Sequence, residues 1–169
     1  EIHERLVGSE MCIRDRHNLY SKKLKERYIM KQLKNMQIIG IDNGYGNLKT
    51  ASGIFPASVL IFDHEPAYAQ DLLVYDGKYH VIGSGHREFT LDKVSNPDHY
   101  ILTLAGIGQE LWAHRMTKAR VYIAAGLPLT WVESQRESFR AYLLQNDHVG
   151  FIWRGIKYHV DIVGADVYA

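Results

Sequence analysis

The chain has 169 residues, of which 46% are apolar and 23% are charged, a composition typical of a folded domain with one core. Residues 1–29 carry seven Lys/Arg and five Asp/Glu, which leaves 13 basic and 14 acidic residues in 30–169. A nearly neutral domain excludes strong electrostatic attraction to nucleic acid or an anionic membrane, so we expect direct binding to neither.

The first 29 residues are expected to lie outside the folded domain. Residues 6–15 read LVGSEMCIRD, which back-translates to a string that looks like the transposase adapter of sequencing libraries, and we treat 6–16 as a scar of that reagent. The polar, basic segment that follows reads as a flexible arm or as translated leader. We expect the natural start at Met30, with Met36 as the second choice, and one domain over 30–169.

Cysteine usage and hydropathy indicate a cytoplasmic protein. The single cysteine, Cys12, falls inside the scar, so the domain has neither a disulfide framework nor a thiol nucleophile. The sequence contains no apolar run of membrane-spanning length and no signal-peptide pattern.

The beginning of the domain is predicted to be β. Residues 36–42 (MQIIGID) form a short, nearly continuous apolar run, typical of a strand covered on both faces. A turn at 43–46 should lead into strands at 47–52 and 54–62. Pro56 interrupts the last of these and marks a strand start or a sheet edge.

A hairpin is predicted next. Residues 72–75 (LLVY) and 78–82 (KYHVI) flank Asp76-Gly77, a favoured two-residue turn. Residues 83–93 lack a clear period and are expected to form a loop.

A helix should begin at residues 95–98 (SNPD), which offer a polar cap, a proline in the first turn and an acid near the positive end of the helix dipole. Apolar residues then recur at helical spacing on one broad face, which predicts an amphipathic helix covering a sheet: Tyr100, Ile101, Leu104, Ala105, Ile107, Leu111 and Trp112. Gly106 and Gly108 suggest close approach of neighbouring backbone.

A buried strand and a second helix are predicted after it. Residues 120–125 (RVYIAA) read as the strand, and residues 126–128 (GLP) end it. Thr130 and Glu133 have the spacing of a capping box, which predicts a helix continuing to about Gln145.

Two final strands, 149–153 and 156–163, should be joined by a turn at Arg154-Gly155. The order of elements predicts an α/β fold with a mixed sheet and crossover helices.

The segment IIGIDNGYGNLKTA, residues 38–51, has the features of a phosphate-binding loop. Gly44 and Gly46 would let backbone N–H groups approach phosphates. Lys49 would supply a cation and shares a strand face with Asn47. Asp42 could hold Mg²⁺ through its water shell.

Other glycine loops do not fit, because GxxxxGK[ST] is absent and the segment after Gly46 reads as a strand instead of a helix. A plain hairpin remains open as an alternative: Asn-Gly is a frequent turn, and strand ends often carry solubilising charges.

Three other kinds of site have weaker signals. The histidines of 30–169 show neither HExxH nor a zinc-type Cys/His spacing. A hydrolase pair of Ser134 or Ser138 with His148 would lack a GxSxG elbow. Two-metal nuclease chemistry needs carboxylates a few ångströms apart, and no spacing shows that Asp42 meets any of three candidates: Asp92, Asp98 and Asp161.

DNGYGNLKTA resembles the first phosphate loop of the actin superfamily, DNGSGxxKxG in actin. VYIAAGLPLTWVESQRESF resembles plasmid-segregating actins of the ParM type, and NPDHYILTLAGIGQEL falls where that family has its first long helix. The resemblance spans residues 30–169 and implies the ribonuclease H-like fold of an actin-like ATPase N-terminal domain.

The resemblance also implies roles for individual residues. Asp42 would orient water around the Mg²⁺ of a bound ATP or GTP, and Lys49 would contact the phosphates. Gly44, Tyr45 and Gly46 would present backbone N–H groups. Tyr45 stands where actin has a small hydroxyl residue, so a hydroxyl-to-phosphate contact is not implied there.

A filament-forming ATPase for plasmid or phage DNA segregation is the function that the resemblance implies. Its partners would be copies of itself and an adaptor protein bound to centromere-like DNA. No second Asp-Gly phosphate loop follows, so we expect a first half that ends before the catalytic residue and is inactive alone. Alternatives are a sugar kinase or heat-shock-type chaperone ATPase of the same fold, and a nucleotide-independent interaction module.

Overall fold

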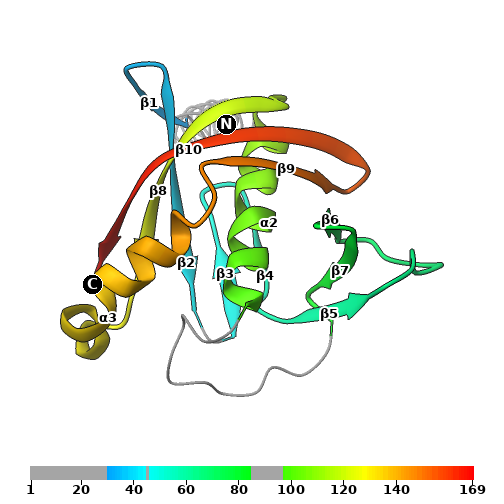
Figure 1. The fold of residues 1–169 in the computed structure, drawn as a ribbon, viewed down its shortest axis with the longest axis horizontal. Helices are drawn as coiled ribbons and strands as arrows, with labels where there is room; N and C mark the ends of the chain where they lie inside the picture. Colours follow the sequence, from blue (N-terminus) through cyan, green and yellow to red (C-terminus); the bar gives the residue numbers. More distant parts are fainter. Residues whose placement is uncertain (1–29, 45, 85–96) are drawn as a thin grey trace, which may run out of the picture.

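The computed structural model describes residues 30–44, 46–84 and 97–169. Within them lie ten strands and two helices (Figure 1). Their bounds are β1 Lys31–Leu33, β2 Met36–Asn43, β3 Asn47–Lys49, β4 Ile54–Pro56, β5 Val59–Phe62, β6 Leu72–Tyr75, β7 Lys78–Ile82, α2 Asp98–Ala113, β8 Lys118–Gly126, α3 Leu129–Leu143, β9 His148–Trp153 and β10 Ile156–Tyr168.

All ten strands belong to one mixed sheet in the order β4-β3-β2-β8-β10-β9-β6-β7-β5, and β1 pairs with β2. The central strands β2, β8 and β10 are parallel, whereas the pairs on either side are antiparallel. Parallel strands need a crossover, and α2 and α3 provide it, as the order of elements predicted.

The strands around Pro56 are shorter than predicted. Strand β3 ends at Lys49 instead of residue 52, and the run 54–62 is divided into β4 and β5. Pro56 is the last residue of β4, and β4 lies at the end of the sheet, which confirms the predicted edge. A proline fits there because it cannot donate to a further strand.

Two tight hairpins have the predicted turns. Asp76 and Gly77 have φ of 50° and 71°, and Arg154 and Gly155 have φ of 49° and 77°. Paired positive φ values match the right-handed twist of the flanking strands. Strand β10, however, runs on to Tyr168, well beyond the predicted end. The predicted loop at 83–93 and the polar cap at 95–96 lie mostly outside the described residues.

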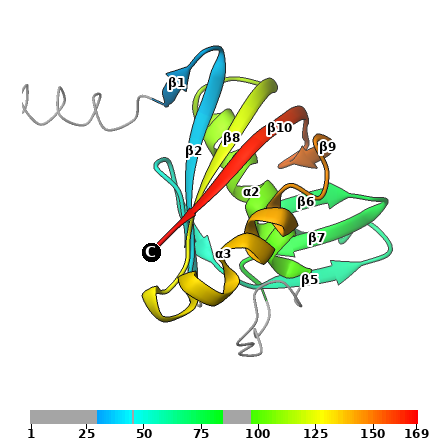
Figure 2. The same cartoon turned by 60° about the vertical axis from the view of Figure 1, so that its left-hand side comes forward.

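Helix α2 is buried on every side, so the prediction of one apolar face was wrong. Residues 99–111 are all buried, including the polar His99, Thr103, Gln109 and Glu110. The sheet curls around this helix, which contacts β2 and β3 on one side and β5, β6, β7 and β9 on the other (Figures 1 and 2).

The two glycines of α2 face side chains and not the backbone that we expected. A Cβ at Gly106 would lie 3.2 Å from Leu48 Cδ2, and one at Gly108 would lie 2.9 Å from Trp153 Cγ. Both positions therefore make room for neighbouring side chains.

Helix α3 begins without the predicted capping box. Its first residue is Leu129, its N-cap is Pro128, and no side-chain cap hydrogen bond is present. Thr130 thus lies inside the first turn, beyond the position of a cap. The helix packs on β10, and Phe139 and Tyr142 contact His99 and Tyr100 of α2.

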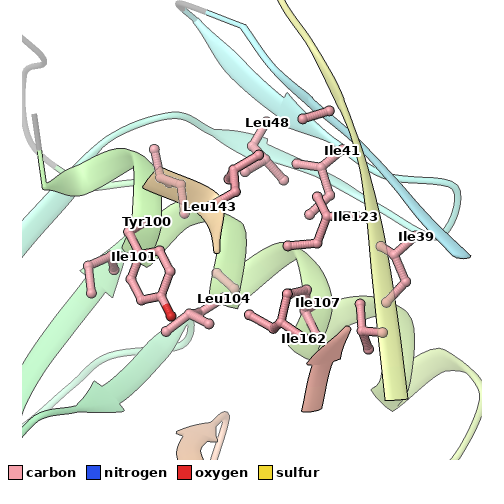
Figure 3. Packing of buried hydrophobic residues seen from close by; sticks show 14 of the residues in the cluster. Ile39, Ile41, Leu48, Tyr100, Ile101, Leu104, Ile107, Ile123, Leu143 and Ile162 are labelled. Atoms are coloured by element: carbon pink, nitrogen blue, oxygen red, sulfur yellow. The ribbon is translucent and has the colours of Figure 1, made fainter. Parts of the chain in front are cut away.

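The core lies between α2 and the curved sheet and includes Ile39, Ile41, Leu104, Ile107 and Ile123 (Figure 3). Strand β10 changes the parity of its inward residues: Tyr158, Val160 and Ile162 are buried first, and Ala165 and Val167 afterwards. The register with β8 shifts between Ile162 and Gly164, which accounts for the change.

None of the helices among the described residues is long and apolar enough to cross a membrane.

Candidate functional site

Asp42 and Lys49 lie opposite each other on β2 and β3. They are register partners in the antiparallel pair, and Lys49 Nζ lies 3.4 Å from Asp42 Oδ2. The side chains of Lys49 and Asp42 are 55% and 59% exposed, respectively, so the ion pair adds only about 0–1 kcal/mol to stability. Both charges are therefore accessible to a ligand at little cost to the fold.

Asn47 and Lys49 share one face of β3, as predicted. Both are exposed, whereas Leu48 between them is fully buried. Leu48 anchors the strand to the core and directs its two polar neighbours outward.

The two glycines between β2 and β3 take part in backbone hydrogen bonds. Gly44 N–H donates to Asn47 O at 3.1 Å, and Gly46 O accepts from Ala57 N–H at 3.0 Å. A Cβ at Gly44 would lie 3.1 Å from Asn47 O, whereas one at Gly46 would meet nothing within 4 Å. A side chain at Gly44 would thus press on the turn, while Gly46 borders open space. Tyr45, predicted to present its N–H, lies outside the described residues.

A hollow of about 390 Å³ adjoins Asp42 and Lys49. It opens where the parallel strands β2, β8 and β10 end, which is where open α/β sheets place ligands. Sequence reasoning missed three of the residues that line it: Thr50, Gly126 and Tyr168. The sequence did indicate that a strand ends at Gly126. It did not indicate the hollow, because the hollow depends on β8 and β10 being neighbours in the sheet.

Gly126 lies close to Asp42. A Cβ there would be 3.8 Å from Asp42 Oδ1, an ordinary van der Waals contact. Tyr168 is 54% exposed and lines the same hollow. Asp42 therefore shares this space with a glycine, an aromatic side chain and the lysine on β3.

The donor set fits magnesium bound together with a phosphate group. Among the described residues no group of three or more His, Cys, Asp or Glu could hold a metal by itself. A single carboxylate beside a lysine suits Mg²⁺, which keeps several waters and takes its other ligands from phosphates. Asp42 would contact the hydrated ion, and Lys49 would offset phosphate charge.

The competing sites do not assemble in the described residues. Asp42, Asp98 and Asp161 line three different hollows, and Asp92 lies outside the described part of the chain. The hydroxyls of Ser134 and Ser138 donate to carbonyls of their own helix. His148 Nδ1 lies 2.7 Å from Asp161 Oδ1, and this contact together with Asp147 raises the histidine's pKa.

Comparison with known protein families shows to which family the chain belongs. A family profile described as the N-terminal domain of actin-like proteins matches residues 40–169. The chain belongs to this actin-like family. A search of curated protein sequences finds no significant match.

Solved structures of actin homologues share the fold. The apo ParM protein of pSK41 superposes with a TM-score of 0.62 at 14% identity, over 80% of this chain and 50% of that one. ParM of Bacillus thuringiensis in its apo form gives 0.59 at 13%, over 80% and 46%. The AlfA filament from the B. subtilis plasmid pLS32 gives 0.56 at 13%, over 77% and 55%.

These likenesses confirm the predicted mixed α/β architecture of an actin-like N-terminal domain. The chain spans about half the length of the structures it matches. At such low identities the superpositions establish the fold of the actin-like domain and leave its ligands to be argued from its own residues.

Proposed function

We propose that this actin-like domain forms one wall of a Mg²⁺–nucleoside triphosphate site in a filament-forming protein. The observation that carries the proposal is the exposed Asp42–Lys49 pair beside a hollow at the ends of β2, β8 and β10. Three similar structures supply the ligand class: those of AlfA and of B. thuringiensis ParM contain AMPPNP, and another of that ParM contains ADP.

Each predicted residue has a role in this proposal. Lys49 binds phosphate oxygens, and Asp42 holds water on the magnesium, which would neutralise phosphate charge when bound. Gly46 allows close approach of the chain, and Tyr45 contributes its backbone N–H. The Gly44 N–H is used by the turn, so Gly44 acts chiefly by shaping the loop. Asn47 lies beside Lys49 on the same exposed face.

A second lobe would complete the site. The hollow is open, and the chain covers about half of each similar structure, so residues following this domain would close over the nucleotide and supply the catalytic group. The proposed domain boundaries are 30–169, with 1–29 outside the native protein.

The proposed biological role is DNA segregation by filaments. Alp12 and AlfA, which share the fold, form filaments. The near-neutral charge of 30–169 favours an indirect link to DNA through an adaptor. We expect the complete protein to scatter light on addition of Mg-ATP, or of Mg-GTP, and to retain little centromere-like DNA without the adaptor.

Nucleotide binding is tested by calorimetry on the complete protein. Lys49→Ala should weaken Mg-ATP binding by about 10- to 100-fold, the range for loss of a charge-assisted hydrogen bond. Asp42→Asn should reduce the affinity in Mg²⁺ and have a smaller effect in EDTA. Lys157→Ala, which removes another exposed lysine, is the matched control. Equal affinities for Lys49→Ala and Lys157→Ala would refute the site.

A further inference from the structure

The turn after Lys49 is held by a buried carboxylate of the central helix. Glu110 is 3% exposed; its Oε1 accepts from Ser52 N–H at 2.6 Å and its Oε2 from the Ser52 hydroxyl at 2.9 Å. Gln109, 6% exposed, donates from Nε2 to Ser52 O at 3.4 Å. Ser52 is thus bound to α2 through its N–H, its hydroxyl and its carbonyl.

Burial of a carboxylate is costly unless hydrogen bonds compensate it. Here one serine satisfies both oxygens of Glu110 with short, charge-assisted bonds, which are roughly twice as strong as neutral ones. Any displacement of Ser52 would leave a buried charge without its donors. The contact therefore favours one position of the turn strongly.

The clamp acts on a weak part of the sheet. Strands β3 and β4 have three residues each, and β4 is at the sheet edge. Hairpins of this length are marginal without further packing. The Asp42–Lys49 pair is exposed on both sides and cannot provide that support.

Both neighbours of Lys49 also rest on α2. At Gly106 the helix leaves room for Leu48 and Thr50, whose side-chain carbons would lie 3.2 and 3.3 Å from an added Cβ. Within the turn, a Cβ at Gly53 would lie 3.0 Å from Gln109 Cγ. Residues on both sides of Lys49, and Gly53 further along the turn, therefore pack against α2.

We propose that Glu110, acting through Ser52, is a positioning residue that holds Lys49 against Asp42 for phosphate binding. The inference rests on the proposed nucleotide site. Lys49 reaches solvent, but its backbone is fixed from the inside of the domain by the Glu110–Ser52 clamp.

The test is a double-mutant cycle on Mg-ATP affinity in the complete protein. Ser52→Ala should weaken binding by about 3- to 10-fold, the equivalent of one hydrogen bond, and Ser52→Thr, which keeps both donors, should retain near wild-type affinity. In the Lys49→Ala background, Ser52→Ala should have no further effect on affinity, because the residue it positions is gone.

Stability is measured in the same variants to separate positioning from folding. Ser52→Ala should lower the urea midpoint equally in the wild-type and the Lys49→Ala backgrounds. Ser134→Ala, which removes one hydroxyl bond on α3, is the control and should leave affinity unchanged. Glu110→Gln, which keeps the shape and removes the charge, should weaken binding in the same direction as Ser52→Ala.

The outcomes separate the two proposals. If Lys49→Ala weakens binding but Ser52→Ala does not, the clamp has no positioning role and the nucleotide site stands. If Ser52→Ala is as damaging in the Lys49→Ala background as in the wild type, it acts by another route and the inference is wrong. If Lys49→Ala leaves affinity unchanged, both the site and the inference are overturned.

Discussion

Helices α2 and α3 are similar in length, with 16 and 15 residues, yet they differ in how much of their surface is covered. Thirteen successive residues of α2 are buried, whereas Phe139 and Leu143 are the two buried residues of α3. The difference arises because the sheet curls around α2 but meets α3 along β10. An equal substitution should therefore have very different effects in the two helices.

The largest difference is expected for leucine truncation. Leu104 in α2 is 0% exposed, and Leu104→Ala should cost about 2–5 kcal/mol of unfolding free energy by removing core contacts and leaving a cavity. Leu129 in α3 is 78% exposed, and Leu129→Ala should stay within about 0.5 kcal/mol. Urea unfolding measures both, and similar losses would contradict the contrast.

Overpacking should come next. Gly108→Ala places a methyl group 2.9 Å from Trp153 Cγ, and Trp153 is itself fully buried. We expect a loss of about 1–3 kcal/mol even though alanine is the better helix former. Gly106→Ala is the internal comparison, because its neighbours there are the side-chain ends of Leu48 and Thr50, which can shift. A larger loss at Gly106 than at Gly108 would be evidence against this packing.

A pH effect near α2 should be smaller. His80 is 5% exposed, and burial lowers its pKa despite a contact between Nδ1 and Leu73 O. The unfolded chain then binds more protons below pH 6.5, so stability should fall from that pH down through the folded pKa. His80→Gln should flatten this acid decline in unfolding midpoints measured across pH.

His148 is far more exposed, and its pKa is shifted in the opposite direction, so it serves as the control. Its raised pKa means that any stabilisation is present at low pH and is lost as the pH rises through the folded value. If the stability of His80→Gln still falls at low pH as in the wild type, groups other than His80 cause that fall.

The smallest effect is expected at Thr130. A capping threonine would contribute about 1 kcal/mol, but Thr130 lies within α3 and makes no cap hydrogen bond. Thr130→Ala should therefore change the unfolding free energy by less than about 0.5 kcal/mol. A loss near 1 kcal/mol in urea unfolding would instead support a capping role for Thr130.

Local chemistry was enough to predict several elements. Asp76-Gly77 and Arg154-Gly155 adopt the predicted turns with positive φ, and the apolar runs within β2 and β8 form strands as predicted. The expectation that these strands are buried on both faces was wrong, because only alternate residues are buried, such as Ile39 and Ile41 in β2 and Val121 and Ile123 in β8. The exposed face shared by Asn47 and Lys49 followed from the alternation of side chains along a strand.

Long-range contacts explain what was missed. Burial of Gln109 and Glu110 depends on Ser52, which is 57 and 58 residues away, respectively. The apparent capping box was a local signal, but the chain entering from Pro128 starts the helix earlier. Gly126 and Tyr168 reach Asp42 only through the parallel register of β2, β8 and β10.

The β-bulge between Ile162 and Gly164 changes which residues at the end of β10 face the core. If the same sequence ran on as a regular strand without the bulge, Ala165 and Val167 would turn to solvent, and the carboxylate of Asp166 would be forced into the apolar core. The aromatic ring of Tyr168 would leave the neighbourhood of Asp42 in the same movement. The bulge therefore decides on which face of the sheet the side chain of Tyr168 lies, although neither Ile162 nor Gly164 lines the proposed ligand hollow.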